Sequence, residues 1–269
     1  MSKKVLVPLA DGFEEIEFVS IVDTLRRADI EVLIAGVRDS GTSGGGASDS
    51  NSAGSANGAS DLKASSPSAH TPNAKDSQYS AGEIYTGAHG ILIHADTALE
   101  SLDSSALAGF DGVALAGGWQ GMLNFKASQK LRTLLREFKA QDKLVSAICA
   151  SPIVLDAAGV LGGKFACYPS CEKFAYEDNS TQNTKHTNTE AKNVTSTIGK
   201  TAEKPLNGQY QPNASVVREG NLITAAGPAT GVLFALEIIA YLLGEAQSQS
   251  IASQMLIPYL NHHAEILRS

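Results

Sequence analysis

Short apolar runs of strand length alternate with helical segments along most of this chain, and this alternation constrains the fold more than any other feature. The apolar runs lie at 5–10, 31–36, 90–94, 110–116, 144–148 and 221–225, and the helical segments at 15–28, 126–140, 152–159 and 231–243. Several of the strands are apolar almost throughout, which is typical of a parallel sheet covered on both faces. The sequence therefore predicts an α/β fold, a mostly parallel sheet between two layers of helices.

The first helix is expected to bury one apolar face. Its apolar residues recur close to the helical period: Ile16, Val19, Ile21, Val22 and Leu25. Glu14 and Glu15 are expected to act only as favourable acidic residues at the positive end of the helix dipole.

Two stretches interrupt the alternation. Residues 39–81 consist mainly of Ser, Gly, Ala, Asn and Asp, and residues 177–206 are rich in Thr, Asn and Lys. Neither has enough apolar surface to offset the entropy lost on ordering. We expect both to be flexible insertions, tolerated on the surface of a single domain over 1–269.

Composition excludes several classes of protein. The net charge of −7 and the lack of a basic patch argue against a nucleic-acid-binding protein. No apolar run reaches the roughly 18 residues that cross a bilayer, so no membrane span is expected. The cysteines number three, which is odd and too few for a disulfide framework. A reducing compartment, the cytoplasm, is therefore predicted.

Cys149 lies between the strand at 144–148 and a helix that begins near Pro152. Proline suits the first turn of a helix, where its missing N–H has no partner to lose. A cysteine at such a sharp turn has the placement of a nucleophile elbow, where free N–H groups and the helix dipole favour the reactive thiolate. The alternative interpretation is a small buried core cysteine, which is common in apolar surroundings.

Three loops are predicted to meet at one edge of the sheet. Cys149, the Gly117-Gly118 turn and Asp11-Gly12 each follow an expected strand. Because sites in open α/β sheets form outside the carboxyl ends of the strands, this edge is the predicted site.

Four segments, in this order and spacing, resemble the DJ-1/PfpI superfamily, and its DJ-1/ThiJ branch in particular: Asp11-Gly-Phe-Glu-Glu-Ile-Glu17, Ala116-Gly-Gly-Trp119, Ala147-Ile-Cys-Ala-Ser151 and Ala226-Gly-Pro-Ala-Thr230. The resemblance covers nearly all of the chain outside the two insertions. It implies a flavodoxin-like α/β sandwich, a homodimer, and a reactive cysteine with a glutamate beside it.

The resemblance also assigns roles to individual residues. Cys149 and Glu17 match the family's cysteine and its neighbouring glutamate. A carboxyl group beside a thiolate is pushed toward its protonated form, and it can also serve as a general base. Gly117, Gly118 and Ala150 are expected to offer backbone N–H groups to a developing oxyanion, and Ser151 is expected to act only as a helix cap. Arg27 matches a family arginine that approaches the site across the dimer interface. The alternative interpretation of Arg27 is a solvated charge at the end of the helix.

One position departs from the family pattern. Many members carry a histidine after the next strand, and here that position is Tyr168. A protease-type Cys-His pair is therefore not expected. Cys167 and Cys171 form a loose Cys-x-x-x-Cys, but a zinc site needs about four ligands and none gather nearby in sequence. No metal and no cofactor are predicted.

Three functions stay open. The first is a glyoxalase or deglycase that acts, without a cofactor, on 2-oxoaldehydes such as methylglyoxal or on their early adducts, and so protects against oxidative stress. The second is a non-enzymatic redox sensor or chaperone that works through oxidation of Cys149. The third is a cysteine peptidase or amidase of the PfpI type, which the missing histidine disfavours.

Overall fold

The computed structural model describes residues 2–38, 83–174, 204–257 and 266–268. Its central sheet contains the strands β1 (Lys4–Leu9), β2 (Glu31–Gly36), β5 (Thr97–Ala98), β6 (Gly112–Leu115), β7 (Leu144–Ile148), β10 (Val216–Glu219), β11 (Leu222–Ala225) and β12 (Ile266–Arg268). Their spatial order is β12-β10-β11-β7-β6-β1-β2-β5, and only the β10–β11 pair is antiparallel. The predicted mostly parallel sheet is confirmed.

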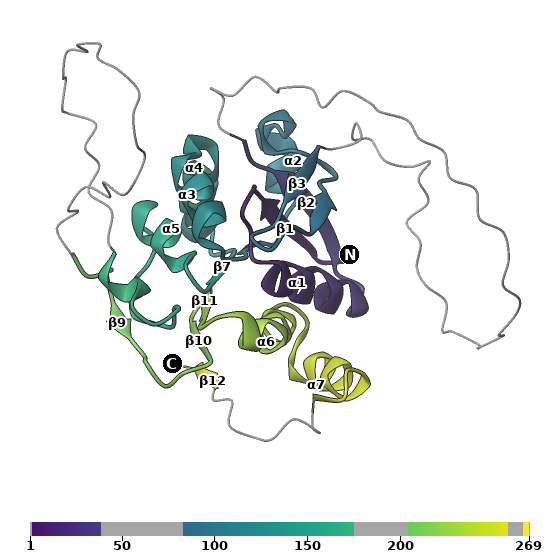
Figure 1. Ribbon diagram of the computed structural model, residues 1–269. Helices are drawn as coiled ribbons and strands as arrows, with labels where there is room; N and C mark the ends of the chain where they lie inside the picture. Colours follow the sequence, from purple (N-terminus) through teal and green to yellow (C-terminus); the bar gives the residue numbers. More distant parts are fainter. Residues whose placement is uncertain (1, 39–82, 175–203, 258–265, 269) are drawn as a thin grey trace, which may run out of the picture.

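Helices cover both faces of this sheet, as predicted. The helices are α1 (Glu15–Arg27), α2 (Ser104–Ala108), α3 (Trp119–Ala127), α4 (Gln129–Ala140), α5 (Pro152–Ala157), α6 (Gly231–Leu243) and α7 (Glu245–Gln254). Helices α1, α6 and α7 lie on one face, and α3, α4 and α5 lie on the other (Figure 1). Two small sheets flank this sandwich, the hairpin β3 (Ile84–Thr86) with β4 (Leu92–His94), and β8 (Lys164–Phe165) with β9 (Gln209–Tyr210).

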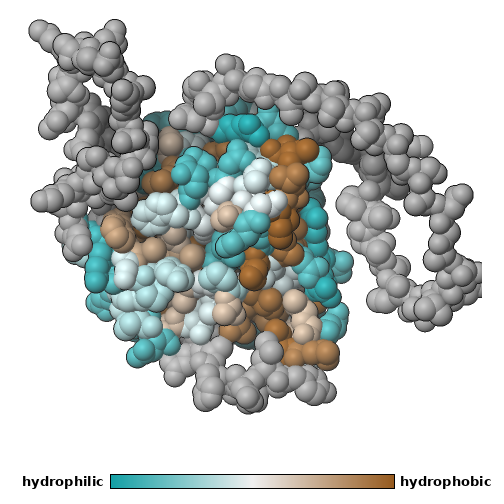
Figure 2. Space-filling model, in the orientation of Figure 1, coloured by the Kyte–Doolittle hydropathy of each residue, from teal (hydrophilic) through white to brown (hydrophobic). Residues whose placement is uncertain are grey.

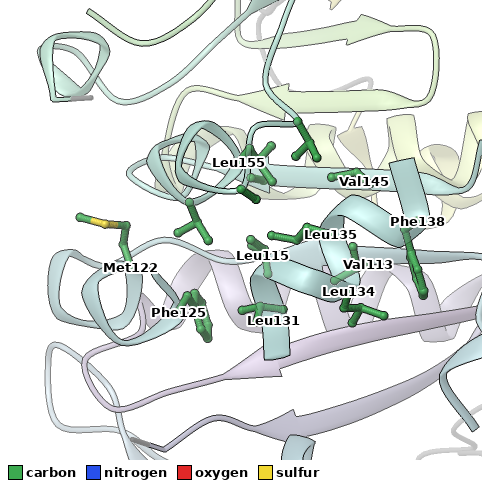
Figure 3. Close-up of a cluster of buried hydrophobic side chains, with 14 of the residues drawn as sticks. Val113, Leu115, Met122, Phe125, Leu131, Leu134, Leu135, Phe138, Val145 and Leu155 are labelled. Atoms are coloured by element: carbon green, nitrogen blue, oxygen red, sulfur yellow. The ribbon is translucent and has the colours of Figure 1, made fainter. Parts of the chain in front are cut away.

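Each face of the sheet carries its own apolar core. Successive side chains of a strand point to opposite faces, so Leu6 packs in one core while Val5 and Val7 pack in the other. Figure 3 shows the core beneath α3 and α4, where Val113, Leu115 and Val145 of the sheet meet the helices' apolar residues: Met122, Phe125, Leu131, Leu134, Leu135 and Phe138. The two cores hold the strands in register and so fix the loops at their carboxyl ends.

Several predicted boundaries were wrong. The helix expected over 126–140 begins later, at Gln129, because Ser128 ends α3 and its hydroxyl then caps α4 by accepting from the Leu131 amide. Most of α3 lies before the expected range and was missed. The sequence analysis also missed α2, α7 and the antiparallel strand β10. These elements are short or polar and carry little helical or alternating apolar pattern.

The face that α1 buries also differs from the prediction. Phe18, Ile21, Val22 and Leu25 are buried, whereas Ile16 and Val19 are exposed. The buried residues form one stripe at spacings of three, one and three, and Ile16 and Val19 lie outside that stripe on the solvent side of the helix. This leaves two large apolar side chains of α1 in solvent.

The two expected insertions, 39–81 and 177–206, fall outside the described residues except for 204–206. At that end the prediction was wrong, because Leu206 is buried and its amide donates to the Glu172 carbonyl at 2.8 Å. Within the described part of the chain, no helix is both long and apolar enough to cross a membrane.

Candidate active site

Cys149 stands at a strained turn directly after β7. Its φ of 64° is left-handed, a conformation that non-glycine residues rarely adopt. Hydrogen bonds hold it from both sides, since its amide donates to the Ala225 carbonyl at 3.0 Å and its carbonyl accepts from the Tyr168 amide at 2.9 Å. With α5 beginning at Pro152, this is the predicted elbow geometry. Strain held in this way is typical of functional positions.

Glu17 reaches this turn from the first turn of α1, and its side chain is fully buried. The Gly117 amide donates to Glu17 Oε2 at 2.7 Å. The other oxygen, Oε1, is buried without a nitrogen or oxygen partner among the described residues. The carboxyl group also forms a side-chain hydrogen bond with the Cys149 thiol. The structure therefore brings together the two residues that the sequence singled out.

Glu14 fixes this arrangement through a ring of three hydrogen bonds. Its amide donates to the Gly117 carbonyl at 3.0 Å, and its carboxylate, as the N-cap of α1, accepts from the Glu17 amide at 2.7 Å. The Gly117–Glu17 bond completes the ring. The sequence analysis gave Glu14 only a general helix-end role. Its position three residues before Glu17 is the capping spacing that would have indicated this contact.

Glycine is required at both positions of the turn after β6. A Cβ on Gly117 would lie 2.6 Å from Cys149 Cβ and 2.7 Å from Glu17 Oε2. Gly118 has a φ of 92°, and a Cβ there would collide with the Gly12 carbonyl oxygen. The turn thus lets the backbone approach the cysteine and the first loop closely, and the three predicted loops do meet at this edge.

Two of the three expected backbone donors lie at the sulfur. The amides of Gly118 and Ala150 both hydrogen-bond the Cys149 side chain. The Gly117 amide is instead committed to Glu17, which corrects its expected role. The donors at the sulfur can also serve an oxyanion that forms on a bound carbonyl group.

Burial raises the proton affinity of both ionisable groups of the site. Burial raises the pKa of Glu17 to about 7, against the lowering effect of the Gly117 amide. Burial, and then the negative charge of Glu17, raise the pKa of the Cys149 thiol well above its ordinary value, and the Gly118 and Ala150 amides only partly offset this. The resting group at Cys149 is therefore the thiol, and not the thiolate that the sequence analysis expected. While Glu17 is ionised, the sulfur holds its proton, and this arrangement can generate a thiolate by moving that proton to Glu17.

Tyr168 lies at the place expected for the family histidine. Its amide contacts the Cys149 carbonyl, and its ring packs near the Gly227 backbone. The described histidines, His89 and His94, belong instead to the β3–β4 hairpin. Among the described residues, Glu17 is thus the carboxyl group that interacts with the cysteine, and the structure offers a protease-type pair no support.

Of two further residues expected at the site, Arg27 forms an ion pair on the surface of α1, whereas Ser151 joins two of the site's loops. Arg27 donates to Asp23 at 2.7 Å, one turn earlier on the exposed side of α1. Ser151 occupies the N-cap position of α5 but makes no capping bond. Its buried hydroxyl donates to the Ala116 carbonyl at 2.6 Å and so ties the elbow to the glycine turn.

Groups with metal-ligating chemistry occur away from the sulfur. Glu14, Glu15 and His89 are the described residues whose ligand atoms gather within 4.8 Å of one another. Glu15 already accepts from the His89 amide at 2.6 Å and contacts its ring at 2.8 Å, so these atoms have protein partners. Cys167 and Cys171 are buried free thiols, and burial raises the pKa of both.

Comparison with known proteins places these features in context. A sequence profile of the DJ-1/PfpI family matches residues 3–241. Protein dj-1beta of Drosophila melanogaster is 31% identical over 260 residues, which cover 96% of this chain and 100% of that protein. The Parkinson disease protein 7 homolog of Danio rerio is 26% identical over 258 residues, covering 95% and 97%.

Solved structures agree with the sequence comparison. The crystal structure of Drosophila melanogaster DJ-1beta has a TM-score of 0.63 and 28% identity, over 95% of this chain and 98% of that one. The structure of oxidized Toxoplasma gondii DJ-1 has a TM-score of 0.61 and 28% identity, with the same coverage.

Proposed function

The chain belongs to the DJ-1/PfpI family, and we propose that it is a cysteine-dependent glyoxalase or deglycase that needs no added cofactor. Its substrates are 2-oxoaldehydes such as methylglyoxal, or their early adducts. The observation that carries this proposal is the buried Glu17 carboxyl, held by the Gly117 amide and hydrogen-bonded to the Cys149 thiol. A base with a pKa near 7 beside a thiol has the proton affinity that general acid–base catalysis at neutral pH needs.

The reaction begins with a proton transfer. Glu17 takes the thiol proton as the Cys149 sulfur attacks the aldehyde carbon, and the carbonyl electron pair moves to oxygen. The amides of Gly118 and Ala150 stabilise that oxygen until Glu17 returns the proton, giving a hemithioacetal.

The second stage moves hydrogen between neighbouring carbons. Glu17 removes the proton on the former aldehyde carbon, and a proton is returned to the ketone carbon. One carbon is oxidised as the other is reduced, so no external oxidant or reductant takes part. The product is a lactyl thioester on Cys149, and water cleaves it to lactate and the free thiol. A deglycase reaction begins in the same way, because the Cys149 sulfur attacks the adduct at the carbon that came from the aldehyde.

The test is lactate formation from methylglyoxal by the purified protein. We expect turnover by the wild type and a loss of at least about a hundredfold in Cys149→Ser and in Glu17→Gln. Cys171→Ser, which removes another buried thiol, is the matched control and is expected to keep activity. Release of free amine from a methylglyoxal adduct of an amino acid tests the deglycase reaction in the same variants. A wild type inactive in both assays overturns the proposal.

A redox sensor is the second candidate, because the related Toxoplasma gondii DJ-1 has been solved in an oxidized form. The Gly118 and Ala150 amides and the Glu17 carboxyl surround the sulfur with hydrogen-bonding groups, which suits a sulfinate at Cys149. Selective gain of two oxygen atoms on Cys149 under mild peroxide, in a wild type that lacks turnover, would favour this function and a role in oxidative stress.

We also propose that the chain forms a homodimer through the exposed apolar residues of α1 and of the β3–β4 hairpin. These are Ile16, Val19, Ile84, Ile91 and Leu92. Glu15 joins the two elements through the His89 and Ile91 amides. Figure 2 shows hydrophobic residues gathered in a band on the side that carries β3 and α1. Contiguous apolar surface of this kind marks a contact site. The free thiols suit a cytoplasmic location.

A further inference from the structure

An exposed pair of aromatic rings is carried by the two backbone segments that hydrogen-bond Cys149. Trp119 and Phe174 meet edge to face, with ring centroids 5.7 Å apart and an interplanar angle of 77°. Their exposed fractions are 52% and 40%. Large aromatic side chains this exposed are unusual away from binding surfaces, because burying them is strongly favourable.

The chain on both sides of this pair is anchored to Cys149. Trp119 directly follows Gly118, whose amide hydrogen-bonds the Cys149 side chain. Phe174 ends the segment that begins at Tyr168, whose amide donates to the Cys149 carbonyl. The Trp119–Phe174 contact therefore joins the two backbone segments that hydrogen-bond Cys149.

We propose that Trp119 and Phe174 form a subsite for a flat aromatic substituent on the carbonyl substrate, so that the site favours aryl 2-oxoaldehydes. This inference rests on the proposed function and names its substrate class. Aromatic pairs gain stability beyond burial of area when a third ring packs against them face to edge or offset. A methyl substituent, as in methylglyoxal, has too little surface to use these rings.

Binding can be followed without turnover, because Trp119 is the only tryptophan of the chain. Cys149→Ser protein is titrated with mandelate, the aryl product, and with lactate, its methyl counterpart, while the tryptophan emission is recorded. We expect a saturable change with mandelate, none with lactate at equal concentration, and roughly tenfold weaker mandelate binding when Phe174→Ala is added. Equal responses to the two acids would overturn the inference.

Kinetics provide the second arm. The ratio of kcat/KM for phenylglyoxal to that for methylglyoxal is expected to fall roughly tenfold in Trp119→Ala and in Phe174→Ala, mainly through KM. Trp119→Phe keeps a ring and is expected to restore most of the ratio, and Leu243→Ala, an exposed apolar residue at the end of α6, is the control. If the two rings only hold the backbone segments in place, kcat/KM falls equally for both substrates and the ratio stays constant. That result would contradict the subsite. Loss of the proposed function instead shows as no turnover of either substrate, whereas the mandelate titration still reports on the rings.

Discussion

The amide of Gly117 donates a 2.7 Å hydrogen bond to Glu17 Oε2, although 100 residues separate the two in sequence. This bond sets the carboxyl group beside Cys149, and the missing side chain of Gly117 leaves room for both. Gly117→Ala places a methyl group 2.6 Å from Cys149 Cβ, so the turn must shift. A displacement of about 1 Å in a catalytic group lowers rates by about a hundredfold.

We therefore expect Gly117→Ala to lower lactate formation by about that factor. Gly162→Ala is the matched control, because a Cβ at that glycine meets nothing within 4 Å. Assays of both variants at equal folded fraction check this, and full activity in Gly117→Ala would show that the close approach is not required.

Burial of Glu17 has a consequence for stability. In the folded chain its pKa is raised from 4.5 to about 7, so the folded state holds a proton that the unfolded chain has already lost. The stabilisation from this proton is complete below about pH 4.5 and is lost as the pH rises through 7. The loss is on the order of 3 kcal/mol.

Glu17→Gln has no ionisable group at this position and keeps an oxygen to accept from Gly117. Between pH 5 and pH 8 the wild type is expected to lose on the order of 2 kcal/mol of unfolding free energy through Glu17. Glu17→Gln is expected not to show this loss. Urea unfolding at both pH values measures this difference. The exposed Glu100→Gln serves as control, and an equal pH dependence for Glu17→Gln and the wild type would refute the assignment.

Ser151 is expected to matter for stability rather than for capping. Its buried hydroxyl donates to the Ala116 carbonyl, and removing a buried donor costs about 1 to 2 kcal/mol. Ser151→Ala should therefore lower the unfolding free energy by that amount, while Ser253→Ala, on the exposed side of α7, stays within about 0.5 kcal/mol of wild type. Equal stabilities of the two variants would show that the Ser151 bond contributes nothing.

The alternation of apolar strands and helices was sufficient to predict the layers, and the order of loops was sufficient to predict the edge at which Cys149, the Gly117-Gly118 turn and Asp11-Gly12 meet. These features follow from local pattern and from the geometry of parallel sheets. The resemblance supplied the partner, Glu17, because three carboxylates occur within four residues and spacing alone favours none of them.

What the sequence could not provide depends on tertiary contact. The pKa of the Cys149 thiol is raised by burial and by the charge of Glu17, which belongs to a segment far from Cys149 in the sequence. The Gly117 amide bonds Glu17 because the turn and α1 meet in space, and the Trp119–Phe174 contact joins residues 55 positions apart. The start of α4 was missed for a local reason. The helical pattern continues across Ser128, so the pattern does not indicate that one helix ends and another begins there.

The proposed dimer has its own test. Ile16→Lys places a charge in the exposed apolar surface of α1, and burying that charge between two copies is unfavourable. We expect light scattering to give a dimer for the wild type and a monomer for Ile16→Lys. Lys126→Glu changes a charge on the opposite helical layer and is expected to leave the dimer intact. A wild-type monomer would rule out this contact.

The central claim is that Glu17 takes the proton of Cys149, and alkylation of Cys149 by iodoacetamide tests it without any substrate. The rate constant is followed against pH by mass spectrometry of the Cys149 peptide. In the wild type we expect the rate to rise through an apparent pKa near 7, as Glu17 becomes able to accept the proton, and then to level. In Glu17→Gln this rise is expected to disappear, leaving slow alkylation that increases only at higher pH. The same rise through pH 7 in Glu17→Gln would contradict the account.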